Sequence, residues 1–150
     1  MTRTTKNVVK ILAIVAILVL AMSMVFVGCD KKTDPNEKKV VILVQNGEEF
    51  DSYELTTTSL YLSDALKELQ AENKLTYSIG SDGTSLVTIN ELETTSDWSK
   101  WICIYHNIDD VALFFPGYDF ELEGVIYHSS AEGVTTCPLQ NGAKYLFRQM

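Results

Sequence analysis

The chain has 150 residues, of which 46% are hydrophobic, and a formal net charge of −8 at pH 7. This length is sufficient for one domain with a hydrophobic core of its own. The acidic surplus argues against nucleic-acid binding, because an acidic surface repels phosphate backbones.

Residues 1–29 have the pattern of an export signal. Three of the first ten residues are basic, and residues 11–27 are all apolar except Ser23. The small residue Gly28 then precedes Cys29. A positive start, an apolar stretch and a small residue at the cleavage point are typical of secretory signals.

The quartet FVGC, residues 26–29, resembles a bacterial lipobox, with Phe26 in place of the commoner leucine. There a signal peptidase cuts before the cysteine, and diacylglycerol is attached to its sulfur. The resemblance implies that residues 1–28 are a lipoprotein signal peptide and that Cys29 becomes the lipidated N-terminus. The alternative is an uncleaved anchor, because a spanning helix needs roughly 17–25 residues and this stretch is at the short end.

Both interpretations place the rest of the chain on the outer face of the cytoplasmic membrane, and we expect a Gram-positive cell surface. The membrane is then a partner through lipidated Cys29. Residues 29–39 contain the polar run DKKTDPNEKK and are expected to form a solvated tether. Removing residues 1–28 takes away three basic residues and no acidic one, so the net charge falls from −8 to −11.

A β-hairpin is expected at the start of the exported domain, residues 40–150. The β-forming runs VVILVQ and EEFDSYELTTT flank Asn46-Gly47. Asn-Gly between such runs predicts a type I′ turn, because both central residues of that turn need positive φ.

A helix is expected next, over residues 60–73. Its apolar stripe has the spacing i, i+4, i+7 and consists of Leu62, Leu66 and Leu69. Ser59 or Ser63 is the expected N-cap, and Asn73 is expected near the C-terminus of the helix.

The remaining residues predict further strands. LTYSI and SLVTINEL flank a Gly80–Gly83 turn and predict a strand pair. KWICIYH is apolar on both faces and is therefore expected to be a central strand. VIYHSS is expected to be another strand. VTTCPLQ and AKYLFRQ flank Asn141-Gly142, which predicts a last hairpin.

The two remaining cysteines, Cys103 and Cys137, do not have the spacing of a metal or redox motif. Each lies in an apolar, strand-like run, so they are expected either as two buried free thiols or, in an exported domain, as a disulfide.

Motifs for catalysis are absent from the sequence: it has no H-E-x-x-H, no G-x-S-x-G and no glycine-rich phosphate loop. Cys103 and His106 are three residues apart in a predicted strand, so they point to opposite faces. The tripeptide IYH occurs twice, and His106 and His128 would approach each other if their strands were neighbours, with Asp109 and Asp110 nearby. Histidines so placed are commoner as ordinary polar-face residues than as ligands. We expect no enzyme, no metal and no cofactor.

The densest group of aromatic residues is Phe114, Phe115, Tyr118 and Phe120, around a Pro116-Gly117 turn. Such a group either closes the core or forms a binding surface. For the second alternative, the predicted ligand-binding residues are Trp101, Tyr105, Phe114, Phe115 and Tyr118.

A hairpin, one amphipathic helix and further strands predict an α+β fold of the β-grasp (ubiquitin-like roll) type, with a mixed sheet packed on one helix. The chain from residue 40 to residue 147 resembles the bacterial lipoprotein relatives of the transcobalamin C-terminal domain. Three stretches carry this resemblance: TTTSLYLSDALKEL, SIGSDGTSLVTINEL and FELEGVIYHSSAEGVTTCPLQNGAKYLF. The sequence departs from the family pattern at Trp101-Ile102, Cys137 and Asn141.

In transcobalamin and intrinsic factor, that domain covers one face of cobalamin beside a larger helical domain. The resemblance therefore implies a flat, corrinoid-like small molecule as one candidate ligand. The expected function is a lipid-anchored, non-catalytic binding module for such a ligand or for a surface polymer. The alternative is a structural or assembly domain that pairs with another surface protein.

Overall fold

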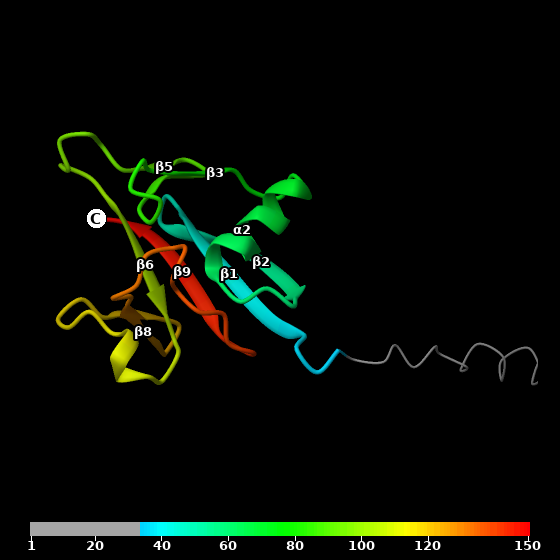
Figure 1. Ribbon diagram of the computed structural model, residues 1–150. Helices are drawn as coiled ribbons and strands as arrows, with labels where there is room; N and C mark the ends of the chain where they lie inside the picture. Colours follow the sequence, from blue (N-terminus) through cyan, green and yellow to red (C-terminus); the bar gives the residue numbers. More distant parts are fainter. Residues whose placement is uncertain (1–33) are drawn as a thin grey trace, which may run out of the picture. The chain divides into compact units, whose positions relative to one another are not determined.

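The computed structural model describes residues 34–150 (Figure 1). The predicted signal peptide, residues 1–28, and the predicted lipidation site Cys29 lie outside the described residues. Within residues 34–150, no helix is both long enough and apolar enough to cross a membrane.

A six-stranded mixed sheet forms the centre of the domain, in the order β2-β1-β9-β6-β8-β7. Its strands are β1 (Lys38–Asn46), β2 (Glu49–Thr57), β6 (Ile102–His106), β7 (Phe120–Leu122), β8 (Val125–Ser129) and β9 (Lys144–Gln149). β1 and β9 are parallel, and the other neighbours are antiparallel.

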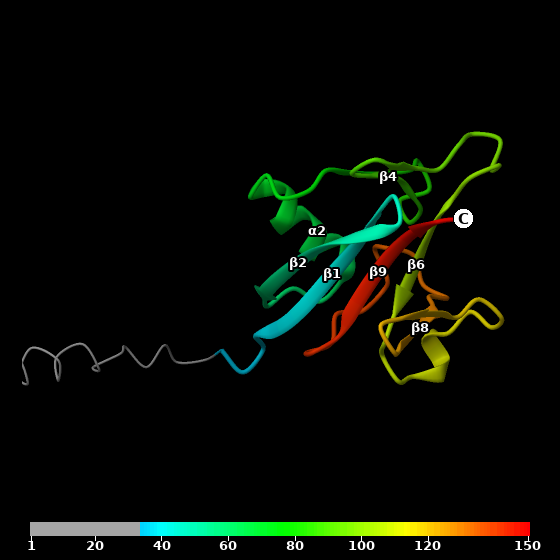
Figure 2. The same ribbon diagram turned by 180° about the vertical axis from the view of Figure 1, so that it is seen from behind.

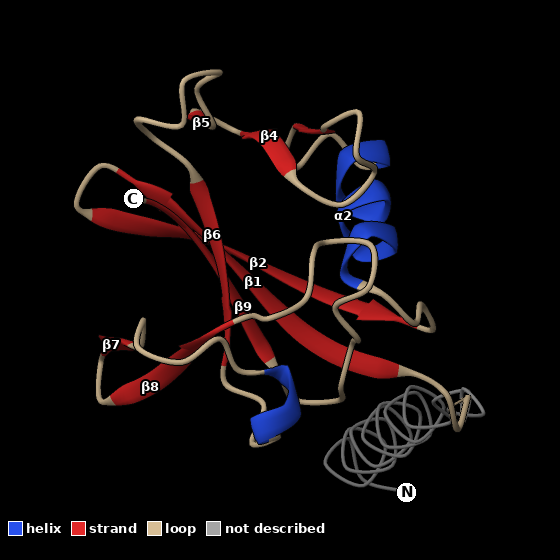
Figure 3. Ribbon diagram, turned by 60° about the vertical axis from the view of Figure 1, so that its left-hand side comes forward, coloured by secondary structure: helices blue, strands red, loops and turns tan. Residues whose placement is uncertain are grey.

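A smaller antiparallel sheet has the order β3-β4-β5. It consists of β3 (Tyr77–Ile79), β4 (Leu86–Ile89) and β5 (Leu92–Glu93). The described helices are α2 (Leu62–Ala71) and a short 3-10 helix (Val111–Leu113). The small sheet and α2 lie on the same side of the large sheet (Figure 3). The expectation of an α+β fold with a mixed sheet and one long helix is confirmed for the described part of the chain.

The first hairpin forms as predicted, but its turn is shifted by one residue. Asn46 still pairs with Glu49, so the two turn residues are Gly47 and Glu48. Gly47 has φ +63°, whereas Glu48 is not among the described residues with positive φ. A positive φ at the first turn position alone indicates a type II′ turn rather than the predicted type I′ turn.

The predicted last hairpin is wrong. Residues 134–140 form no strand and contribute only an isolated bridge between Pro138 and Tyr61. Their carbonyls instead accept hydrogen bonds from the first turn of α2: Leu62 N donates to Cys137 O (3.0 Å) and Ser63 N to Val134 O (2.9 Å). β9 runs beside β1 and β6, where Val41–Val44 pair with Lys144–Phe147.

These long-range hydrogen bonds also make the predicted serine N-cap wrong. The N-cap of α2 is Tyr61, and it makes no side-chain capping bond. The carbonyls of Cys137 and Val134 accept hydrogen bonds from the first backbone amides of α2, which the side chain of an N-cap serine would otherwise accept. No local cap is therefore required. The other end agrees with the expectation. Asn73 has φ +57°, and Lys74 N donates to Leu69 O (2.9 Å), which is a Schellman-type ending.

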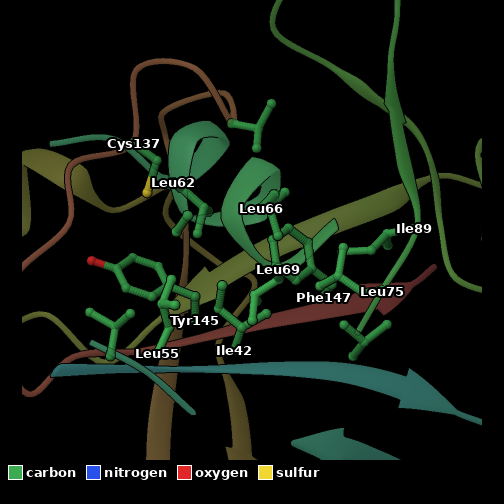
Figure 4. Packing of buried hydrophobic residues seen from close by; sticks show 14 of the residues in the cluster. Ile42, Leu55, Leu62, Leu66, Leu69, Leu75, Ile89, Cys137, Tyr145 and Phe147 are labelled. Atoms are coloured by element: carbon green, nitrogen blue, oxygen red, sulfur yellow. The ribbon is translucent and has the colours of Figure 1, made fainter. Parts of the chain in front are cut away.

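The predicted helical stripe packs into the core. Leu62, Leu66 and Leu69 are fully buried and face Ile42, Tyr145 and Phe147 of the sheet (Figure 4). A second, smaller cluster lies on the reverse face of the sheet and contains Tyr105, Tyr127 and Leu146. That face carries no described helix (Figure 2).

β6 lies between β9 and β8, as its two apolar faces predict.

Cys103 and Cys137 are both free thiols, and Cys137 is buried. Cys137 lies outside the strands, contrary to the expectation, in the segment that caps α2. Burial raises the pKa of the Cys137 thiol to about 11, so it is protonated at neutral pH.

Candidate functional site

Both tryptophans of the chain line one cleft, which we call the tryptophan cleft. Trp98 and Trp101 are 62% and 39% exposed, respectively. The cleft has a volume of about 200 Å³, and its other walls come from the start of β4, from β6 and from residues 129–133. Exposed aromatic side chains beside a concave surface are common in ligand sites.

A second hollow, of about 460 Å³, adjoins the first. The two share Ser85, Leu86, Thr94 and Trp98, so these residues lie where the two hollows meet. The second hollow extends towards the β3–β4 turn at residues 80–82.

The Trp98 loop, residues 94–101, joins β5 to β6 and is held by its own hydrogen bonds. Thr95 N donates to Lys100 O (2.9 Å), and Lys100 N donates to the Thr95 hydroxyl (3.1 Å). Asp97 accepts from the Ser99 backbone N (3.1 Å) and from its hydroxyl (2.8 Å). A hydrogen bond from the Thr95 side chain, followed by those from Ser99, lowers the pKa of Asp97 to about 2.

Trp98 itself has φ +57°. This left-handed conformation costs an ordinary L-residue roughly 1–2 kcal/mol. Local strain of this kind, maintained by the surrounding hydrogen bonds, is frequent at functional sites. The loop therefore holds a large apolar side chain in solvent, in a conformation that glycine would adopt more easily.

Trp101 is also fixed in place. Its backbone exchanges hydrogen bonds with Met150, with Met150 N donating to Trp101 O (2.9 Å) and Trp101 N to Met150 O (3.3 Å). Its indole Nε1 donates to Cys103 Sγ (3.1 Å). An indole that is already held in place loses less entropy when a ligand binds to it.

Gly133 brings one wall of the cleft close to the other. A Cβ at this position would lie 2.9 Å from the Thr84 Cβ and 3.0 Å from the Thr84 carbonyl oxygen. Next to it, Val134 N donates to Thr84 O (3.0 Å). Only glycine allows this approach without a shift of backbone.

Each hollow has one carboxylate in its lining, Glu132 in the tryptophan cleft and Asp82 in the second hollow. No lysine or arginine is among the lining residues of either. Asp82 accepts from the backbone N of Thr84 and of Ser85 (3.0 Å each) and from the Ser85 hydroxyl. The Ser85 and Thr84 hydrogen bonds lower the pKa of Asp82 to about 2, so it is ionised at neutral pH.

The five predicted ligand-binding residues are distributed over four places. Trp101 lies in the tryptophan cleft, whereas Tyr105 is only 1% exposed and packs 6.2 Å from Phe120, centroid to centroid. Burial raises the pKa of Tyr105, which is consistent with a core residue. Phe115 and Tyr118 are 52% and 50% exposed and lie together, with their ring centroids 5.9 Å apart.

Phe114, the fifth of these residues, is half-buried beside β8. Its ring stacks on His128 with centroids 3.8 Å apart, and Phe115 N donates to Ser129 O (2.7 Å). The segment that carries Phe115 and Tyr118 lies apart from the Trp98 loop (Figures 1 and 2). The structure therefore joins two of the predicted residues with each other but not with Trp101.

Trp98 is the site residue that the sequence analysis did not identify. The available signal is its setting, TTSDWSK, in which one aromatic residue is surrounded by polar turn-forming residues between two strand-like runs. Such a residue has no place in a strand stripe and has to be explained by the loop itself.

The two histidines approach as the sequence suggested, since His106 and His128 are directly paired across β6 and β8. Phe114 lies against both imidazole rings, at 5.9 Å and 3.8 Å. His106 is buried, with Nε2 3.2 Å from Leu113 O and no partner for Nδ1 among the described residues. His128 Nδ1 lies 3.0 Å from Asp119 Oδ1. Burial lowers the pKa of His106.

This arrangement does not fit a metal ion. Within residues 34–150, no three or more histidine, cysteine, aspartate or glutamate side chains are grouped closely enough to hold one. Asp110, one of the two aspartates expected nearby, instead accepts a hydrogen bond from Ala112 N (3.0 Å) at the start of the 3-10 helix. The His106–Phe114–His128 group is a packed, partly buried cluster.

Comparisons with known proteins identify the fold rather than a family. No family model matches the chain, and no curated protein matches it significantly in sequence. A solved structure from Ruminococcus gnavus ATCC 29149, described as "a putative metal binding protein", has a similar fold, with a TM-score of 0.51. The two sequences are 18% identical, and the match covers 76% of this chain and 97% of the other. The fold of this chain is therefore one that a known bacterial protein also has.

Proposed function

We propose that the exported domain is a non-catalytic binding module and that the tryptophan cleft is its ligand site. The observation that carries the proposal is that both tryptophans of the chain line the same concave surface, one of them in a left-handed conformation. Packing alone gives no reason to hold a largely exposed indole in that conformation. The absence of catalytic sequence motifs favours binding over catalysis.

The proposal includes a specific fold, the β-grasp of transcobalamin C-terminal-like domains. It is supported by the parallel pairing of β1 with β9, with α2 following the β1–β2 hairpin. The resemblance of residues 40–147 to that family makes a flat, corrinoid-like molecule one candidate ligand. The domain would hold it alone or together with a partner protein.

The proposed location is the outer face of the cytoplasmic membrane, with lipidated Cys29 as anchor and residues 29–37 as tether. The expected tether ended at residue 39, but Lys38 and Lys39 belong to β1, where they pair with Thr57 and Thr56. The support is the lipobox-like quartet and the polar composition that follows it. The acidic domain would be repelled by an anionic membrane surface, which suits a module that stands away from the lipid.

The chain contains a built-in reporter for this site, because its two tryptophans are both in the cleft. The experiment uses the full-length protein, purified from its source in detergent. Native mass spectrometry detects a retained ligand or partner, and tryptophan fluorescence before and after ligand removal shows whether it occupies the cleft. We expect a retained small molecule whose removal changes the fluorescence.

Trp98→Ala and Trp101→Ala should lose the retained ligand, whereas Tyr118→Ala, an exposed aromatic outside the cleft, should keep it. Retention of the ligand by both tryptophan variants would show that the cleft is not the site.

The second candidate function is a structural or assembly domain, and the exposed Phe115–Tyr118 pair favours it. Two exposed aromatic rings in contact are typical anchors of protein interfaces. In this case native mass spectrometry would show a protein partner or a dimer, and Tyr118→Ala would remove it while the tryptophan variants would not.

A further inference from the structure

We infer that the tryptophan cleft and the adjoining second hollow bind an uncharged carbohydrate, with the Trp98 indole between two neighbouring pyranose rings. This inference rests on the proposed function and deepens it by naming the class of ligand. It is carried by the size of the hollows, their aromatic walls and the chemistry of their polar groups.

The sizes favour separate small rings over one large flat ring system. The tryptophan cleft has a volume of about 200 Å³ and the second hollow about 460 Å³. Sites for drug-sized molecules typically measure about 300–1,000 Å³ as one space. Here the space consists of two hollows that share Trp98 in their lining, an arrangement that suits a chain of linked rings better than one rigid macrocycle.

The indoles supply the apolar contact that a sugar ring requires. One face of a pyranose carries several C–H groups, which are slightly positive, and an aromatic face is slightly negative. Trp98 and Trp101 both line the cleft and are both exposed. Because Lys100 N donates to the Thr95 hydroxyl and the Ser99 hydroxyl donates to Asp97, the backbone of the Trp98 loop has little freedom left to lose on binding.

The polar lining matches sugar hydroxyls. Thr84 and Ser129 are among the lining residues of the tryptophan cleft, and Ser81 and Ser96 are among those of the second hollow. Thr94 and Ser130 also line the cleft, but their hydroxyls already donate within the protein, to Leu86 O and Glu132 O. Hydroxyls both donate and accept, as sugar hydroxyls do.

The charges of the lining select against anions. An ionised carboxylate accepts hydrogen bonds and does not donate them. Glu132 and Asp82 can therefore each accept from a sugar hydroxyl in a charge-assisted hydrogen bond. With no basic residue in either lining and 17 acidic against five basic residues over residues 40–150, a phosphate or an acidic sugar would be repelled. The ligand is therefore not an anion.

The test titrates the full-length protein with oligosaccharides of increasing length, followed by tryptophan fluorescence and by calorimetry. The probes are β-1,4-linked glucose and β-1,4-linked N-acetylglucosamine, each from one to six rings. Galacturonic acid oligomers are the anionic comparison, and cyanocobalamin is the macrocyclic one. The detergent has to be a polyoxyethylene ether, since maltoside head groups are themselves sugars.

We expect one neutral series to bind, with the affinity rising about tenfold or more from one ring to two, because the second ring fills the second hollow. The galacturonic acid oligomers should not bind. Trp98→Ala should weaken binding at least about tenfold, and Trp98→Tyr, which keeps an aromatic face, should restore part of it. Tyr118→Ala should bind as the unchanged protein does, and the melting temperature of each variant verifies its fold.

The outcomes separate this inference from the proposed function. If cyanocobalamin or the retained molecule changes the tryptophan fluorescence and neither neutral series does, the carbohydrate inference is overturned and the cleft stays the site. Equal binding of the galacturonic acid oligomers would also overturn it. If Trp98→Ala and Trp101→Ala keep the retained ligand, the cleft itself is the wrong site and both fail.

Discussion

The helix-covered face of the large sheet and the Trp98 loop both hold large apolar side chains, but they use them in opposite ways. Under α2, Leu66 and its neighbours are completely buried against Ile42 and Phe147. In the loop, hydrogen bonds hold Trp98 out into solvent at a positive φ. The difference shows that apolar character alone does not identify a core residue, because a short polar loop can hold an indole against the hydrophobic effect.

The largest expected effect of a single change belongs to the core. Leu66→Ala should lower the free energy of unfolding by about 2–5 kcal/mol, because it removes buried methyl groups and leaves a cavity. Urea denaturation measures it. Leu60→Ala is the matched control, since Leu60 precedes the same helix but is exposed, and it should change stability by less than about 0.5 kcal/mol. Equal losses would break the contrast between the two regions.

Gly133→Ala should affect both stability and binding. The new methyl group would meet Thr84 at 2.9 Å, and relieving that contact should cost about 1–3 kcal/mol and displace one wall of the tryptophan cleft. Gly80→Ala is the control for stability alone, because Gly80 lines the second hollow and a Cβ there would meet its closest atom, a carboxylate oxygen of Asp82, at 3.3 Å rather than 2.9 Å. A Gly133→Ala protein of unchanged stability would show that this wall is not tightly packed.

The His106 cluster should make the sheet sensitive to acid. The pKa of His106 is lowered in the folded protein because the ring is buried, so the unfolded chain binds the proton more readily. The contribution of His106 to the free energy of unfolding is therefore fully present above the pKa of about 6.5 that histidine has in the unfolded chain. It is lost as the pH falls below that value.

Urea midpoints at pH 7.5 and 5.5 test this expectation, with His106→Phe as the variant that cannot titrate. The unchanged protein should lose stability between the two values, and the variant should lose less. A loss of the same size in His106→Phe would assign the effect to other groups.

Replacing Trp98 should change stability little and ligand binding strongly. Trp98→Gly removes an exposed side chain and relieves the positive φ, while adding flexibility to the unfolded chain. The free energy of unfolding should stay within about 1 kcal/mol of its original value. Ligand retention should nevertheless be lost. A Trp98→Gly protein that is strongly destabilised would place Trp98 with the core rather than with the site.

The elements that the sequence predicted correctly are those with a local physical cause. Leu62, Leu66 and Leu69 have helical spacing, and a segment with this spacing buries one face whatever it packs against. The first hairpin follows in the same way from two β-forming runs joined by a short turn. Two of the errors, the last hairpin and the serine N-cap, arose where partners are distant in the chain. Residues 134–140 have the apolar character of a strand, but their carbonyls cap α2.

The sequence by itself determined the acidic character of the domain, the α+β class, the helix face that is buried and the export pattern ending at Cys29, because each depends on composition or on spacing between near neighbours. Only the tertiary structure decided which aromatic residues share a surface. Tyr105 and Trp101 are four residues apart, yet one is in the core and the other lines the cleft. Trp98 meets Thr84 and Glu132 at the cleft through strand pairing and the close approach at Gly133, and such contacts leave no periodic signal in the chain.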